Sequence, residues 1–187
     1  YAELSRENPA LVYCSISGYG RTGPDKNKPG YDFAIQGRGG YMSITGQPDG
    51  PPTKVGLPVI DVLAALNAAI GILCALRARE STGQGQLVDV SLLDAEVSAL
   101  VNQGSNWLMG GVVPRRWGNA NPNVAPYQTF QSADGWFNVA VGNNDQFARL
   151  CGAVGASALA EDPRYASNTL RIENRETLIA ALAHRLR

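Results

Sequence analysis

The sequence of 187 residues predicts an α/β fold in its first half and a small α+β unit in its second half. In the first half, short β-branched runs alternate with one long apolar segment, a pattern typical of βα units. In the second half, two strand-like runs flank a tight turn and two further helices follow. Apolar residues make up 44% of the chain, which is enough to build a buried core.

The elements of the first half can be placed in order. The run Leu11–Ile16 is bounded by polar and Gly residues and predicts a buried strand. Turn-forming residues occupy 25–30, and a helix is expected from Tyr31 to Gln36, ahead of the glycines that begin at Gly37. Residues 86–90 form the second predicted strand.

Between these strands lies the most apolar segment, Val59–Glu80, which is predicted to form a helix. It is apolar on every side, so we expect it inside the fold. Its apolar part, Val59–Leu76, is interrupted by Asp61 and Asn67 and is shorter than the roughly 20 residues of a membrane span. A buried helix is therefore favoured over a membrane helix, with Gly83 placed as its left-handed C-cap.

Ser91 and Asp94 have the spacing of a capping box and predict a helix that continues to about Met109. The composition then shifts to Gly, Pro and Asn, which predicts a linker or crossover over residues 110–126. The prediction is thus a first domain over 1–109 and a second over 127–187. The second domain is expected to contain a hairpin (127–131 and 136–141) and two helices (145–154 and about 169–187).

Composition excludes several classes of function. The formal net charge is zero and no basic stripe is present, which argues against nucleic-acid binding. The three cysteines are far apart in apolar segments and predict buried thiols of a reducing, cytoplasmic compartment. The one histidine, His184, lies near the end of the chain. A histidine-dependent catalytic triad or metal site within this chain is therefore not expected.

Gly18, Gly20 and Gly23 have the spacing of a dinucleotide-binding loop. That loop works because its third glycine opens a helix whose N–H groups hold the pyrophosphate. Here Pro24 and further turn residues follow Gly23, and the acidic residue expected about 20 positions later is missing. We therefore interpret the glycines as a strand-exit loop that needs glycine backbone angles, and we expect no NAD site.

Asp61 is the one acid in the apolar part of this helix, Val59–Leu76. Two interpretations are open on the residues alone. A carboxylate in the first turn complements the helix dipole and is stabilised by about 0.3–1 kcal/mol. Alternatively, glycine-rich loops present a desolvated carboxylate to a cleft, where it acts as a general base or a covalent nucleophile.

Three stretches of the chain resemble the class III CoA-transferases, the group of formyl-CoA transferase, carnitine CoA-transferase and the α-methylacyl-CoA racemases. They are "NPALVYCSISGYGRTGP", "PGYDFAIQGRGGYMSITGQPDGPP" and "LPVIDVLAALNAAIGILCALRARESTGQGQLVDVSLLDAE". The resemblance continues through "YQTFQSADGWFNVAVGNNDQFARLCGAVG" and "DPRYASNTLRIENRETL". It covers nearly the whole chain.

The resemblance implies that Asp61 is the nucleophile that takes an acyl group from an acyl-CoA and passes CoA to a carboxylic acid. Coenzyme A is then a substrate, and no separate cofactor or metal is implied. The family fold implies a Rossmann-like large domain, a small domain and two interlaced chains. It also implies that this chain is an internal part of a longer protein, inactive or poorly folded alone.

Other site residues are carried over from the same resemblance. Racemases of the family have a histidine where this chain has Tyr31, and a tyrosine phenol is a poor base at neutral pH. Tyr31 therefore favours CoA transfer, with racemisation or isomerisation of an acyl-CoA and non-catalytic acyl-CoA binding as alternatives. Tyr31, Gln36 and Gly40 are expected to contact substrate or CoA. Lys28 is either a CoA-phosphate contact or a solvated loop charge.

Overall fold

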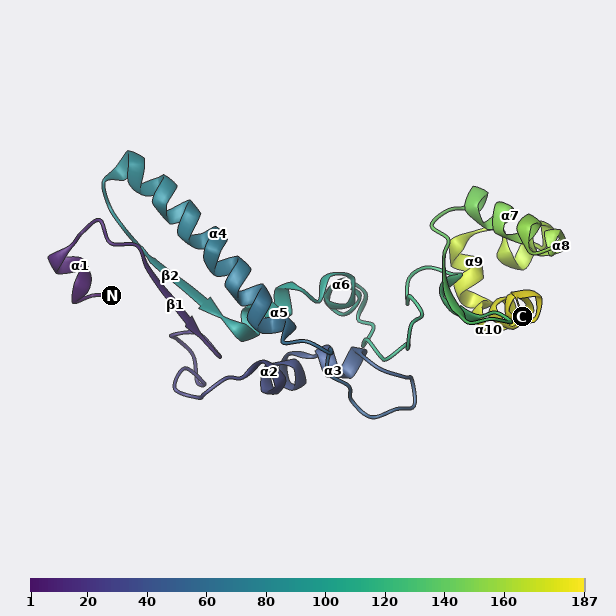
Figure 1. The fold of residues 1–187 in the computed structure, drawn as a ribbon, viewed down its shortest axis with the longest axis horizontal. Helices are drawn as coiled ribbons and strands as arrows, with labels where there is room; N and C mark the ends of the chain where they lie inside the picture. Colours follow the sequence, from purple (N-terminus) through teal and green to yellow (C-terminus); the bar gives the residue numbers. More distant parts are fainter. Residues whose placement is uncertain (187) are drawn as a thin grey trace. The chain divides into compact units, whose positions relative to one another are not determined.

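The computed structural model describes residues 1–186 of the chain. It consists of two compact units, Tyr1–Arg116 and Trp117–Arg187. The division between them lies inside the Gly-, Pro- and Asn-rich segment 110–126. Figure 1 labels the α-helices of both units and the two strands of the first.

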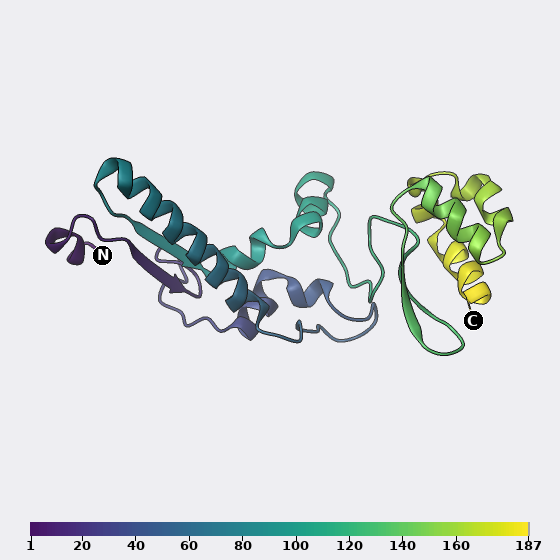
Figure 2. The ribbon, with the colours of Figure 1, turned by 45° about the horizontal axis from the view of Figure 1, so that its top comes forward.

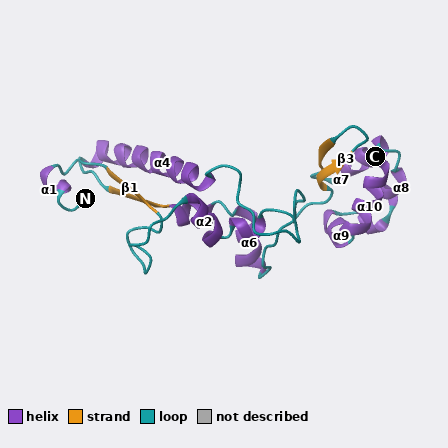
Figure 3. Ribbon diagram, turned by 60° about the horizontal axis from the view of Figure 1, so that its bottom comes forward, coloured by secondary structure: helices purple, strands orange, loops and turns teal. Residues whose placement is uncertain are grey.

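The first unit is built on a pair of parallel strands, β1 (Tyr13–Ser17) and β2 (Leu87–Ser91). Tyr13 pairs with Leu87, and the register continues to the last residue of each strand. Helix α4 (Val59–Thr82) connects them and lies along the strands, as Figure 3 shows with the strands in orange. This confirms the predicted βαβ arrangement. A short helix, α1 (Leu4–Glu7), precedes β1.

Helix α4 is less buried than the sequence predicts. Ile60, Ala64, Ala68 and Ala75 are buried against the strands and the next helix. Large apolar side chains on other sides of the helix are exposed, including Leu73 at 65%. The small buried alanines let the backbone approach the sheet on one side, and no element of the described chain covers the other. By length and hydropathy α4 also qualifies as a membrane span, a property that core helices of soluble proteins share.

Helices α2 (Asp32–Gly39) and α3 (Tyr41–Ile44) follow the glycine loop. The predicted helix continues through Gly37 and ends at Gly40, whose φ of 114° is readily adopted only by glycine. A kink of this kind allows α3 to start immediately in a new direction. Helix α2 packs against α3, α4 and α5.

The helix predicted after Ser91 forms as two shorter helices, α5 (Leu92–Ser98) and α6 (Val101–Gly110). Its N-cap is confirmed, since Ser91 Oγ accepts a hydrogen bond from the backbone N–H of Asp94 at 2.9 Å. The break lies at Val101, which has a φ of 47°. This conformation is rare for a β-branched residue and no sequence pattern signals it.

The second unit packs helices on a hairpin, as Figure 2 shows. Strands β3 (Tyr127–Gln131) and β4 (Trp136–Ala140) are antiparallel, which confirms the predicted hairpin. The helical elements are α7 (Asn144–Ala153), α8 (Ser157–Glu161), the 3-10 turn η1 (Pro163–Tyr165), α9 (Asn168–Glu173) and α10 (Arg175–Leu186). The predicted final helix is divided at Asn174, whose side-chain amide donates a second hydrogen bond to the Leu170 carbonyl beside the one from its backbone N–H.

The cysteine prediction is partly correct, and the predicted backbone conformation of the glycine loop is confirmed. All three cysteines are free thiols, but Cys74 is exposed on the uncovered side of α4, and only Cys151 is buried. Turns rather than a helix follow Gly23, as predicted. Gly20 and Gly23 have φ of 82° and 81°, so the loop requires glycine for its backbone angles.

Candidate active site

Asp61 lies in the first turn of α4, and its side chain is exposed. Of the two interpretations of Asp61, the described chain matches the first-turn carboxylate, and the carboxylate is not desolvated there. The segment before it, Gly56–Pro58, is exposed as well, while Ile60 is fully buried. Ile60, the buried residue next to Asp61, holds the backbone in place and leaves the Asp61 carboxylate accessible to a ligand.

The start of α4 is capped by a residue from another helix. Pro58 occupies the N-cap position and offers no side-chain hydrogen bond. Asp32, at the start of α2, fills this role because its Oδ1 accepts the backbone N–H of Ile60 at 2.8 Å. Aspartate is a preferred N-cap residue, because its carboxylate accepts a backbone N–H that has no partner in the first turn. Here the aspartate lies 28 residues away in the sequence.

This hydrogen bond brings two predicted site residues to the same place. Tyr31 directly precedes Asp32, and Asp61 directly follows Ile60, so the bond joins the immediate neighbours of both. Tyr31 is 77% exposed and Asp61 is exposed. The starts of α2 and α4 therefore lie together, and each carries an exposed polar side chain, the Tyr31 phenol and the Asp61 carboxylate.

Gln36 does not lie on that surface. It is fully buried, its Nε2 donates to Asp32 Oδ2 at 2.6 Å, and its Oε1 accepts the backbone N–H of Val55 at 2.8 Å. The expected substrate contact is thus replaced by contacts within the protein. The spacing of four residues between Asp32 and Gln36 puts both on one face of α2.

Gly40 has a backbone role as well, because its positive φ forms the junction of α2 and α3. Next to it, Glu96 Oε1 accepts the backbone N–H of Tyr41 at 2.9 Å. A side chain at Gly39 would collide with the Glu96 carboxyl, because a Cβ there would lie 2.2 Å from Oε2. The junction therefore requires glycines at both positions and a carboxyl group beneath them.

Glu96 is a buried acid with only one satisfied oxygen. It is fully buried, and its Oε2 has no hydrogen-bond partner. Burial raises the pKa of this carboxyl group, the Tyr41 N–H partly offsets the rise, and the negative charge of Asp32 adds to it. Burial, with the Glu96 charge adding, likewise raises the pKa of the Tyr41 phenol.

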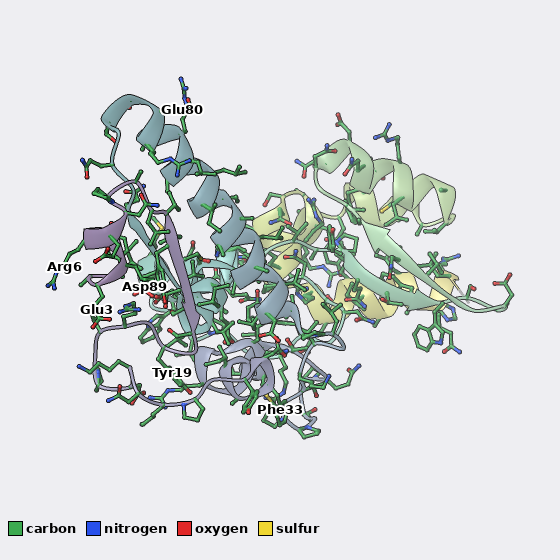
Figure 4. The ribbon with its side chains drawn as sticks, turned by 60° about the vertical axis from the view of Figure 1, so that its left-hand side comes forward. Glu3, Arg6, Tyr19, Phe33, Glu80 and Asp89 are labelled. Atoms are coloured by element: carbon green, nitrogen blue, oxygen red, sulfur yellow. The ribbon has the colours of Figure 1, made fainter. Side chains whose placement is uncertain are left out.

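Lys28 lies in the glycine-loop region and is ion-paired. Its Nζ is 2.7 Å from Asp25 Oδ1, and Arg38 bridges to the same carboxylate. The hydrogen bond from Lys28 and the charges of both cations hold the pKa of Asp25 below its usual range. Arg38 also stacks over the Tyr19 ring, 5.0 Å from its centroid. Tyr19 and Phe33 are labelled near α2 in Figure 4.

Sequence reasoning missed Asp32 and Glu96. Both leave a signal that can be used. Asp32 precedes Gln36 by one helical turn, a spacing for polar pairing. Glu96 follows Leu92 by the same interval and stands beside Ala95, so it lies on the apolar face of its own helix. An acid on such a face indicates a buried polar contact.

Among residues 1–186, no cluster of three or more His, Cys, Asp or Glu side chains could hold a metal ion. The described site thus consists of the Asp61 carboxylate and the Tyr31 phenol, supported by the hydrogen-bonded polar side chains of α2. Such a site can supply a nucleophile and a hydrogen-bond donor.

Comparison with known sequences identifies strong relatives. The chain is 45% identical over 175 residues to a succinate–glutarate CoA-transferase of Agrobacterium fabrum, covering 94% of this chain and 44% of that protein. It is 43% identical over 183 residues to an acetyl-CoA:oxalate CoA-transferase of Acetobacter aceti, covering 97% and 47%. The chain therefore spans about half the length of the curated relatives it matches.

Solved structures give the same result for the fold. A CaiB/BaiF family protein from Brucella suis matches with a TM-score of 0.80 and 46% identity, over 100% of this chain and 49% of that one. A hypothetical protein from Mycobacterium tuberculosis matches with a TM-score of 0.85 and 28% identity, over 99% and 49%. All 187 residues match the family described as CoA-transferase family III, and the chain belongs to that family.

Proposed function

We propose that this chain carries the nucleophile of an enzyme that moves CoA from an acyl-CoA donor to a carboxylic acid, and that Asp61 is this nucleophile. The chain belongs to CoA-transferase family III. The observation that carries the proposal is that the Asp61 carboxylate is exposed, while its neighbour Ile60 is buried and donates its backbone N–H to Asp32. Family membership supports the reaction class, and the exposed position of Asp61 at the start of α4 supports the choice of residue.

In the proposed reaction, an Asp61 oxygen attacks the thioester carbonyl of the donor, forming a mixed anhydride and releasing CoA thiolate. The thiolate attacks the Asp61 carbonyl, forming an aspartyl-CoA thioester and releasing the donor acid. The acceptor carboxylate then attacks this thioester, giving a second anhydride and thiolate. A last thiolate attack on the acceptor carbonyl yields the new acyl-CoA and regenerates the Asp61 carboxylate.

The position of Asp61 suits this chemistry. The N-terminus of a helix favours negative charge, so the attacking carboxylate and the returning aspartate are both stabilised. Tyr31, exposed at the start of α2, is proposed to donate a hydrogen bond to substrate rather than to remove an α-proton. Lys28, held by Asp25, is proposed to contribute to the charge that CoA phosphates meet.

The relatives suggest where to look for substrates. Those reported above are named for succinate, glutarate and oxalate, which are short dicarboxylic acids. We propose acids of this class as first candidates for donor and acceptor. We further propose that the two units are parts of the family's large and small domains, and that the complete protein is a cytoplasmic, interlaced homodimer that covers the exposed side of α4.

The test is to trap the intermediate in the complete protein. The protein is incubated with succinyl-CoA or another short acyl-CoA, quenched with hydroxylamine, and the peptide around Asp61 is analysed by mass spectrometry. A hydroxamate on Asp61 is expected, and Asp61→Asn should abolish it and turnover together.

Asp145→Asn is the matched control, because Asp145 is also an exposed acid in the first turn of a helix. It should leave both the label and turnover unchanged. Turnover with no modified Asp61 would contradict the proposal. Exchange of an α-proton with solvent deuterium, without CoA transfer, would favour racemisation instead.

A further inference from the structure

The polar side chains of α2 hold both ends of the short segment that leads into Asp61. Val55 donates its backbone N–H to Gln36, and Ile60 donates its backbone N–H to Asp32. The two acceptors are themselves joined by the hydrogen bond from Gln36 Nε2 to Asp32 Oδ2. One pair of side chains on one helical face thus fixes both ends of residues 55–60, and we call this pair the Asp32–Gln36 clamp.

The segment between these two points has little other support. Gly56, Leu57 and Pro58 are exposed, and a Cβ built at Gly56 would meet no atom within 4 Å. The backbone hydrogen bonds that do occur here are local, from Val59 to the Leu57 carbonyl and from Val62 to the Pro58 carbonyl. Local bonds define the shape of the turn, and at its end Val59 and Ile60 pack in one apolar cluster with Ile35 of α2. The clamp adds a directional hydrogen bond to α2 at each end of the segment.

We propose that the Asp32–Gln36 clamp positions Asp61 for attack, so that Gln36 acts on the reaction from inside the protein without touching substrate. This rests on the proposed role of Asp61 as nucleophile. Burial supports it, because Gln36 is fully buried and its amide engages a protein atom at both ends. A nucleophile displaced by about 1 Å can lose about 100-fold in rate, so a rigid start of α4 has catalytic value.

The direct test measures turnover and backbone exchange in the complete protein. Gln36→Met keeps the size of the side chain and removes both hydrogen bonds. We expect kcat to fall about 10- to 100-fold with little change in KM for the acyl-CoA. Amide hydrogen exchange of the peptide covering residues 55–60 should become faster. Gln84→Met, at an exposed glutamine beyond the far end of α4, is the matched control and should change neither.

A reversed clamp separates positioning from loss of stability. In the double variant Asp32→Asn with Gln36→Glu, the new amide can donate to the new carboxylate, and one oxygen of each remains for the Ile60 and Val55 N–H groups. Net charge is unchanged. We expect each single variant to be slow and the double variant to recover kcat to within a few-fold of the wild type. This variant also tests the proposal if Gln36→Met does not fold.

Three results would overturn the clamp. The first is a raised KM with unchanged kcat in Gln36→Met, as a substrate contact would give. The second is unchanged exchange of residues 55–60 in that variant. The third is a double variant no faster than the single ones. Hydroxylamine trapping on wild-type Asp61 decides the proposed function separately, because amide exchange does not depend on turnover.

Discussion

The two units of the chain differ in how completely they cover their apolar side chains and their most buried ionisable side chain. In the second unit, the hairpin and the helices enclose one apolar cluster (Phe130, Val141, Phe147, Cys151, Tyr165, Leu178 and Leu182). In the first unit, large apolar side chains on α4 and α6 remain exposed, and one oxygen of the buried Glu96 carboxyl group has no hydrogen-bond partner. The unit that carries Asp61 is therefore the less self-sufficient one, as expected where surface is reserved for binding.

The buried charges show the same contrast. In the second unit, the Arg171 guanidinium donates to the Ala125 and Tyr165 carbonyls and to Asn144 Oδ1, and it stacks over the Phe147 ring. Burial lowers the pKa of Arg171, and neutral oxygen atoms accept the hydrogen bonds of its guanidinium group. In the first unit, Glu96 has one partner for two oxygens. Both units contain a buried ionisable side chain, but only in Arg171 does every polar atom have a hydrogen-bond partner.

The largest expected effect comes from removing that cation. Arg171→Met leaves two buried carbonyls and the Asn144 amide without their donor, so the free energy of unfolding should fall by about 3–5 kcal/mol. Chemical denaturation of the 187-residue chain measures this loss. Arg149→Met, at an exposed arginine on α7, is the control and should change the free energy by less than about 0.5 kcal/mol. Equal losses in both variants would contradict the buried, hydrogen-bonded position of Arg171.

Next in size is the difference between the covered and uncovered sides of the first unit. Ile35 is fully buried and Leu73 is 65% exposed. Ile35→Ala should reduce the free energy of unfolding by about 2–4 kcal/mol, because it leaves a cavity. Leu73→Ala should change it by less than about 0.5 kcal/mol in this chain. A large loss for Leu73→Ala would show that this side of α4 is covered after all.

Glu96 should give a pH-dependent effect of smaller size. Its pKa is raised on folding, so the folded chain holds this proton more tightly than the unfolded chain does. The resulting stabilisation is complete below the unfolded value of about 4.5 and is lost as the pH rises through the folded pKa. The slope for one group cannot exceed about 1.4 kcal/mol per pH unit.

Glu96→Gln removes this titration and keeps an oxygen for the Tyr41 N–H. The free energy of unfolding of the variant, relative to the wild type, should therefore increase as the pH rises from about 4.5. Denaturation curves at a series of pH values measure the difference. Parallel curves for the two proteins would contradict the buried position of the carboxyl group.

The smallest expected effect compares one helix cap in each unit. Ser91 Oγ accepts the Asp94 N–H at 2.9 Å, and Ser167 Oγ accepts the Leu170 N–H at 3.3 Å. Ser91→Ala should cost about 1 kcal/mol, and Ser167→Ala should cost less because its hydrogen bond is longer. Thermal denaturation of both variants provides the comparison, and a larger loss for Ser167→Ala would reverse the predicted order.

The sequence predicted local structure better than long-range contacts. The strands, the hairpin, the Ser91 cap and the Gly83 C-cap depend on neighbouring residues, and all of them form as expected. The exposure of α4 was missed, because an apolar pattern shows what a helix can bury and does not show what is available to cover it.

The candidate site shows the same limit. The resemblance pointed to Asp61, and the position of this residue at the start of a helix could be predicted. The capping of α4 by Asp32 could not, because the donor and the acceptor are 28 residues apart in sequence. Gln36 was assigned to substrate for the same reason, since only the fold shows that its amide is already engaged inside the protein.

One isotope measurement tests the central claim about Asp61 most directly. The complete protein is allowed to turn over with an acceptor acid labelled with ¹⁸O in its carboxylate, and the peptide containing Asp61 is then weighed. In the proposed reaction the acceptor oxygen becomes the bridge of the second anhydride and remains on aspartate when CoA leaves with the acyl group. The account predicts ¹⁸O on Asp61 after turnover. Complete turnover with an unlabelled Asp61 would contradict it.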